Sequence, residues 1–165
     1  MPTAVVYYSK SGNTRFAADE LGRRLQAPVV AVEAGSPREY RGILGFIRGG
    51  FRSVRQKSST IKGEPWNELT GVDEIYLLSP IWAGSANPVI NGFLDNADLR
   101  GKTVHVATFQ ADPKGDRAPV VHQYLKRRIA ECGGSPGRTW ALESEAPGKF
   151  AGEDKLRAQV DRILA

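Results

Sequence analysis

The chain has 165 residues, a length that predicts one compact domain over residues 1–165. Its only cysteine, Cys132, excludes an intrachain disulfide and a cysteine-rich metal site, and no metal site is expected. No leader segment is visible at the start, and no apolar run approaches the roughly 18 residues of a membrane-spanning helix. We therefore expect a cytoplasmic protein.

The net charge of +5 comes largely from one segment. Between Arg41 and Lys62 there are six basic residues and no acidic ones, more than the whole surplus of the chain. The sequence thus predicts a local basic patch rather than a generally basic surface.

Short β-branched and aromatic runs alternate with longer segments of helical period. Strands are predicted at residues 3–8, 29–32, 75–78, 103–108 and 139–142. Most of these runs are nearly continuously apolar, which is typical of parallel strands covered by helices on both faces. The pattern predicts an α/β fold with a single doubly wound, five-stranded parallel sheet in the order 2-1-3-4-5.

Five helical segments are predicted between and after the strands. The first follows Thr14, the third begins at Asn87-Pro88, and the last begins near Gly152. Asparagine followed by proline is typical of a helix start. The asparagine side chain can cap the helix, and proline is well accepted as the first helical residue. The buried stripes of the first, third, fourth and fifth segments are predicted to contain Ala17, Leu21 and Leu25; Val89, Ile90, Phe93 and Leu94; Val121, Leu125 and Ile129; and Leu156, Val160 and Ile163.

The second helical segment carries an apolar stripe with a basic stripe beside it. We interpret it as a crossover helix whose arginines face solvent, although several glycines weaken it. The second interpretation is a docking face for an acidic redox partner or an anionic membrane surface near a lipid-soluble quinone. No nucleic-acid-reading motif accompanies the charge, so nucleic-acid binding is not expected. The basic residues of this stripe are Arg41, Arg48, Arg52 and Arg55.

The most informative motif joins the first strand to the first helix. A helix N-terminus offers free N–H groups and the positive end of its dipole to an anion. Gly12 permits the backbone to fold around that anion. Uncharged side-chain donors suited to phosphate oxygens are supplied by Ser9, Ser11, Asn13 and Thr14. The predicted phosphate-binding residues are Ser9, Lys10, Ser11, Gly12, Asn13 and Thr14. Neither a nucleoside-triphosphate loop nor a dinucleotide fingerprint is present.

This loop, in its setting after a strand and before an amphipathic helix, resembles the phosphate loop of the flavodoxin family. The segment of residues 79–84, which leads into Asn87-Pro88, and the segment of residues 99–104 resemble that family too. The resemblance covers nearly the whole chain. It implies a flavodoxin-like fold and one FMN molecule as cofactor.

The resemblance also assigns the isoalloxazine ring to the loops after the third and fourth strands. Trp82 is expected to stack on or border the ring, since its flat aromatic face suits a flat heterocycle. Backbone groups of the same loop would reach the polar edge of the ring, and Phe109 and Gln110, which are predicted to begin the loop after the fourth strand, would lie near it. The predicted ring-site residues are Pro80, Ile81, Trp82, Ala83, Gly84, Phe109 and Gln110.

The loop of residues 109–117 departs from the family pattern, because it has an aromatic only at its start. It also carries Lys114 and Arg117, which would stabilise an anionic reduced flavin. We therefore expect a higher reduction potential than that of an ordinary acidic flavodoxin.

These observations predict an FMN-dependent electron-transfer protein or simple oxidoreductase that exchanges electrons with a redox partner protein or a small acceptor such as a quinone. An FMN-dependent quinone or protoporphyrinogen-type reductase is an alternative, as is a flavodoxin-fold interaction module without cofactor. No catalytic side chain is assigned, because the flavin supplies the redox chemistry. His105, His122 and Cys132 are interpreted as structural residues.

Overall fold

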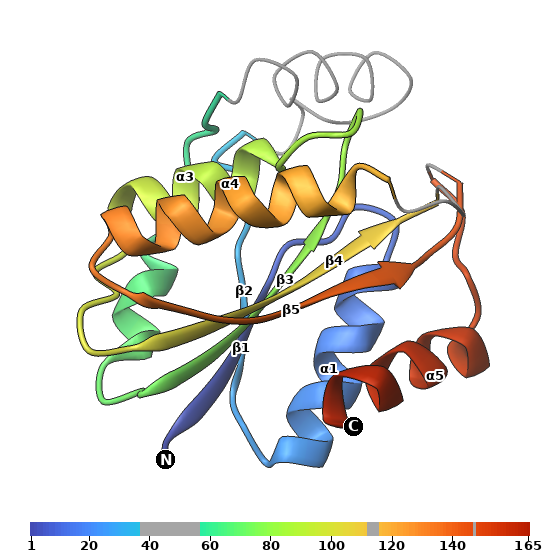
Figure 1. The fold of residues 1–165 in the computed structure, drawn as a ribbon, viewed down its shortest axis with the longest axis horizontal. Coiled ribbons are helices and arrows are strands. Elements are labelled where there is room, and N and C mark those ends of the chain that lie inside the picture. Colours follow the sequence, from blue (N-terminus) through green and yellow to red (C-terminus); the bar gives the residue numbers. More distant parts are fainter. Residues whose placement is uncertain (37–56, 112–115, 147) are drawn as a thin grey trace.

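The computed structural model describes residues 1–36, 57–111, 116–146 and 148–165. Its centre is one parallel five-stranded sheet in the order β2-β1-β3-β4-β5 (Figure 1). This confirms the predicted fold class and strand order. The strands are β1 (Thr3–Tyr7), β2 (Val29–Ala31), β3 (Glu74–Pro80), β4 (Thr103–Gln110) and β5 (Ser135–Glu143).

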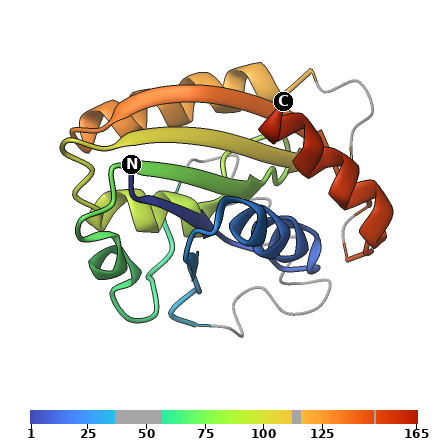
Figure 2. The same ribbon diagram turned by 90° about the horizontal axis from the view of Figure 1, so that it is seen from below.

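Helices cover both faces of the sheet, as the views in Figures 1 and 2 show. On one face lie α1 (Asn13–Leu25) and α5 (Glu153–Leu164), and on the other α3 (Pro88–Asn96) and α4 (Ala118–Glu131). Each face has its own buried cluster of apolar side chains. Burying one large apolar side chain completely is worth about 1.5–3 kcal/mol, so the two clusters fix the layered arrangement.

The predicted helix starts have identifiable causes. The side chain of Asn87 accepts a hydrogen bond from the N–H of Val89 at 2.9 Å, and Pro88 occupies the first turn of α3. The first turn of α5 contains Glu153 and Asp154, whose charges suit a helix N-terminus. The predicted basic helix with its arginines lies outside the described residues. A short 3-10 helix, η2 (Pro65–Leu69), precedes β3 and was not predicted.

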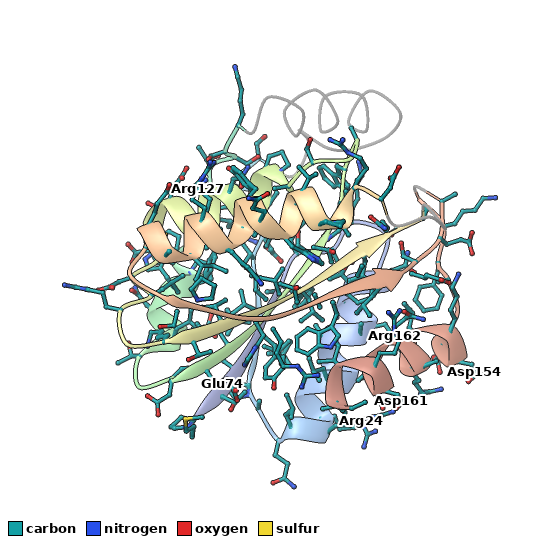
Figure 3. All side chains as sticks on the ribbon, viewed as in Figure 1. Arg24, Glu74, Arg127, Asp154, Asp161 and Arg162 are labelled. Atoms are coloured by element: carbon teal, nitrogen blue, oxygen red, sulfur yellow. The ribbon has the colours of Figure 1, made fainter. Side chains whose placement is uncertain are left out.

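An ion pair links the two helices on the same face of the sheet. The guanidinium of Arg24 on α1 contacts the carboxylate of Asp161 on α5, and both residues are labelled in Figure 3. Arg24 also donates from Nε to Glu20 at 2.7 Å. The contact with Asp161 joins the helix that follows the phosphate loop to the last helix of the chain.

Both histidines have structural contacts. His105 on β4 lies 2.9 Å from a carboxylate oxygen of Glu74, and His122 on α4 lies 2.7 Å from the hydroxyl of Thr108. Burial lowers the pKa of His122, and the charge of nearby Lys126 lowers it further.

The described ranges contain no helix both long and apolar enough to cross a membrane.

Candidate functional site

The candidate site lies at the carboxyl edge of the sheet, where the segments after β1 and β3 meet. Ser9, Lys10, Ser11 and Gly12 form the loop after β1, while Asn13 and Thr14 are the first residues of α1. Two contacts join this loop to the one after β3. The Tyr8 and Trp82 rings pack edge to face with centroids 5.6 Å apart, and the Lys10 ammonium lies 5.8 Å from the centroid of the Trp82 ring.

The N-terminus of α1 is left open to an anion. Gly12 occupies the N-cap position with φ 88°, and having no side chain it cannot cap the helix. The first turn contains no acidic residue. Asn87 caps α3 and acidic residues begin α5, whereas α4, like α1, has neither a side-chain cap nor an acidic residue in its first turn. The first-turn N–H groups of α1 therefore have no partner within the helix and suit a phosphate group.

Side-chain hydrogen bonds of Ser9 and Asn13 hold the phosphate loop in its conformation. The hydroxyl of Ser9 accepts the N–H of Gly12 at 3.1 Å, which closes the turn. The Asn13 amide donates to Ser11 Oγ at 3.0 Å and to the Lys149 carbonyl at 2.8 Å, and its oxygen accepts the N–H of Ala151 at 2.8 Å. Asn13 thus holds the loop in place with its side chain, which leaves its backbone N–H as the group suited to phosphate.

Burial lowers the pKa of the Lys10 ammonium. A cavity of about 220 Å³ adjoins the same loop on the side of β2. Its lining contains two basic residues, Lys10 and Arg15, and one acidic residue, Glu33. The net positive lining around Gly12 suits an anion bound at the loop.

The loop after β3 forms a tight hairpin. The N–H groups of Trp82 and Ser85 each donate to the carbonyl of the other residue, at 3.2 and 2.9 Å. Between them Ala83 and Gly84 have φ values of 48° and 68°. Positive φ at both central residues is typical of a type I′ turn and is unfavourable for alanine. This strained turn presents the half-buried Trp82 indole at the edge of the site.

The structure brings Pro80 and Ile81 next to the end of β4. Pro80 pairs with Phe109 in the sheet, and the N–H of Ile81 donates to the Phe109 carbonyl at 2.8 Å. The Phe109 side chain itself is only 1% exposed and packs in the core beneath α1 and α5. Gln110 is 8% exposed, and its carbonyl accepts the N–H of Ser144. Phe109 and Gln110, predicted to begin the loop, are instead the last two residues of β4. Phe109 borders the predicted ring site with its backbone and not with its ring.

Three residues that support the phosphate loop were not predicted from the sequence. Lys149 and Ala151 hold Asn13, and the ring of Phe150 packs edge to face on Phe16 with centroids 6.1 Å apart. A methyl group added at Gly12 would lie 4.0 Å from the Phe150 ring. The loop before α5 carries no phosphate-binding motif, so the sequence holds no signal that links it to the site.

Arg117, predicted for its charge, lies directly against the hairpin. Its Nε donates to the Gly84 carbonyl at 3.2 Å.

Lys114, the other basic residue predicted beside the ring, lies outside the described residues. Within the described part of the chain, no group of three or more His, Cys, Asp and Glu side chains is placed to hold a metal ion.

Comparison with solved structures identifies the fold. No protein-family model matches the chain, and no curated protein matches it in sequence. A candidate flavoprotein from Bacteroides uniformis is 17% identical, with a TM-score of 0.69 over 96% of this chain and 97% of that one. A flavoprotein in complex with FMN from Lactobacillus acidophilus is 17% identical, with a TM-score of 0.64 over 84% and 91%.

Oxidised flavodoxin 1 from Bacillus cereus is also similar. It is 16% identical, with a TM-score of 0.55 over 97% of this chain and 92% of that chain. Together with the strand order, these matches show that the chain has the flavodoxin-like fold, as the sequence resemblance predicted. At these identities the likeness establishes the fold, and the function has to be argued from the site.

Proposed function

We propose that the chain binds one FMN and acts in electron transfer or as a simple flavin-dependent oxidoreductase. The observation that carries the proposal is the uncapped N-terminus of α1, which begins beside the Trp82 hairpin at one edge of the sheet. A phosphate site and an aromatic platform are the two ends that an FMN molecule requires. Structural neighbours with the same fold include two proteins in complex with FMN.

In this proposal the phosphate binds at the first turn of α1. The backbone N–H groups of Asn13 and Thr14 would donate to it, with the hydroxyls of Ser9 and Ser11 and the ammonium of Lys10 nearby. The strained Ala83–Gly84 turn would place backbone polar groups at the edge of the ring. The flavin supplies the redox chemistry when bound, and the protein binds, orients and electrostatically tunes it.

The finer activity is part of the same proposal. A carrier depends on an added reductase and a partner protein, whereas a quinone or protoporphyrinogen-type reductase turns over its small-molecule substrates, such as a nicotinamide donor together with a quinone acceptor, without any added protein. The arginines at positions 41, 48, 52 and 55 are proposed to contact an acidic partner or a membrane surface, and a cytoplasmic location is proposed with them. The interaction module without cofactor is the competing hypothesis.

An FMN titration separates the two FMN-dependent functions from the interaction module without cofactor. We expect the purified protein to show flavin absorbance or to take up added FMN in a one-to-one complex. Ser11→Asp places a carboxylate beside the phosphate and should weaken FMN binding by at least tenfold, which corresponds to about 1.4 kcal/mol. Ser135→Asp makes the same change at the opposite edge of the sheet, on the exposed start of β5, and should leave affinity unchanged. The proposal would be refuted if the purified protein showed no flavin absorbance and did not bind added FMN.

A further inference from the structure

A groove lies between the Trp82 hairpin and the first half of α4. It has a volume of about 220 Å³. One wall is formed by residues 83–86, and the other by Arg117, Val120, Val121 and Tyr124. Drug-sized ligands need pockets of about 300 Å³ or more, so this groove suits a molecule of one or two rings.

The floor of the groove is apolar. Ala86 and Val121 are 3% and 2% exposed, so they belong to the core and form a fixed surface. Val120 is 52% exposed, which makes it one of the few large apolar side chains on the described surface. The Tyr124 hydroxyl accepts a hydrogen bond from Arg128 Nη1 at 3.0 Å, which holds its ring in the wall. A flat apolar molecule would cover Val120 and gain the free energy of burying it.

The mouth of the groove carries a fixed positive charge. Arg117 lies so close to the hairpin that a methyl group added at Gly84 would meet Arg117 Nε at 2.8 Å. Its Nε donates to the Gly84 carbonyl, which orients the guanidinium at the rim. Guanidinium is a planar donor that suits an oxygen acceptor. A pure hydrocarbon would leave this donor unused, whereas a phosphate would place its charge on the apolar floor at a desolvation cost.

We propose that this groove binds a small planar aromatic molecule with a carbonyl oxygen, of the quinone type. Its ring lies on Val120 and Val121, and its oxygen faces Arg117. The groove shares Ala83 and Gly84 with the predicted flavin site, so the bound molecule would lie beside the strained turn. The inference concerns binding and goes beyond the proposed FMN site, because it can be tested with no FMN present.

The test is a titration of the FMN-free, isotope-labelled chain with tetramethyl-1,4-benzoquinone, followed by amide NMR spectra. This probe has no open ring position to which the Cys132 thiol could add. We expect saturable shifts at Gly84, Ser85, Val120 and Val121. Shifts that do not saturate, or that spread over the surface, would overturn the proposal.

Three variants sharpen the result. Val120→Asp places a carboxylate against the ring and should weaken binding by at least about tenfold. Pro119→Asp makes the same charge change in the same helical turn, on an exposed residue outside the groove lining, and should change affinity less than about twofold. Arg117→Gln should weaken binding several-fold if the carbonyl oxygen is recognised.

Both aspartates fall in the first turn of α4, where an acidic residue is favourable, so the variants are expected to fold. The dispersion of each spectrum checks this directly. Equal affinities of the two aspartate variants would contradict the proposed location, and unchanged binding by Arg117→Gln would contradict the role of the carbonyl. A failure here leaves the FMN titration unaffected, so the two proposals are judged separately.

Discussion

The side chain of Asn13 joins the first turn of α1 to Lys149, 136 residues further along the chain, through a hydrogen bond of 2.8 Å. Its amide oxygen also accepts the N–H of Ala151, and the side chain is buried with the residue only 4% exposed. One asparagine therefore holds together the phosphate loop and the loop before α5.

Replacing Asn13 with alanine should destabilise the protein. Asn13→Ala leaves the Ala151 N–H and the Lys149 carbonyl without this partner, which costs about 1–3 kcal/mol of unfolding free energy. Urea denaturation measures the loss. Asn67→Ala is the control, since that side chain is exposed and its amide donates to the exposed Glu64, and it should change stability by less than about 0.5 kcal/mol. Equal effects of the two variants would show that the Asn13 bridge contributes little.

Arg117 should raise the reduction potential of bound FMN. Its guanidinium is held against Gly84 in the predicted ring loop, where a cation stabilises the anionic reduced flavin. We expect Arg117→Gln to lower the potential of the fully reduced couple by an amount on the order of tens of millivolts, because solvent screens the exposed charge. A spectroscopic redox titration measures it.

The matched control removes a cation elsewhere. Arg157 on α5 contacts Glu153 at 2.9 Å and lies over the Phe16 ring, on the face of the sheet opposite α4. Arg157→Gln should leave the potential nearly unchanged. If both variants shift it equally, the effect comes from net charge and not from the position of Arg117.

Glu20 should make stability fall in acid. Hydrogen bonds from Arg23 and Arg24, at 2.8 and 2.7 Å, lower the pKa of Glu20 from 4.5 to about 2. The unfolded chain therefore binds the proton more readily than the folded one. The stabilisation is fully present above pH 4.5 and is lost as the pH falls toward 2.

We expect this contribution to be about 1 kcal/mol, because the side chain of Arg23 is 70% exposed and solvent screens the pair. Glu20→Gln should be less stable at neutral pH and should lose less stability between neutral pH and pH 3, measured by urea denaturation at each pH. Glu68→Gln, at an exposed position on η2, should follow the native curve. A Glu20→Gln curve parallel to that of the native chain would disprove the coupling.

The sequence predicted the fold well because its elements depend on local signals. Apolar runs marked the strands, and Asn87-Pro88 marked the start of α3. The phosphate loop was found because glycine and small polar residues follow a strand directly. Its support was not found, because the partners of Asn13 lie more than a hundred residues away and are backbone groups, whose identity leaves no mark in the sequence.

The start of β5 shows the same limit. It was predicted at residue 139, whereas the strand begins at Ser135, and Pro136 and Gly137 are ordinarily strand breakers. Proline is accepted because β5 is an edge strand. Gly137 lies where the pairing of β4 with β5 shifts register, opposite His105. The N–H of the next residue, Arg138, donates to the His105 ring at 2.9 Å.

This arrangement predicts a specific coupling between Gly137 and His105. A methyl group added at Gly137 would lie 2.3 Å from His105 Nδ1, far inside van der Waals contact. Gly137→Ala should therefore cost about 1–3 kcal/mol of unfolding free energy as the ring is forced aside. His105→Ala is also expected to destabilise, since it removes the acceptor of the Arg138 N–H and the contact with Glu74.

A double-mutant cycle separates the clash from the two individual losses. Once His105 is alanine, the space beside Gly137 is open, so adding Gly137→Ala should cost at least about 1 kcal/mol less than it does in the native chain. Urea denaturation of the four proteins gives the coupling free energy. Additive effects would show that the ring moves aside freely. In that case the glycine at 137 would be explained by the backbone of the bulge alone, and not by the imidazole packed against it.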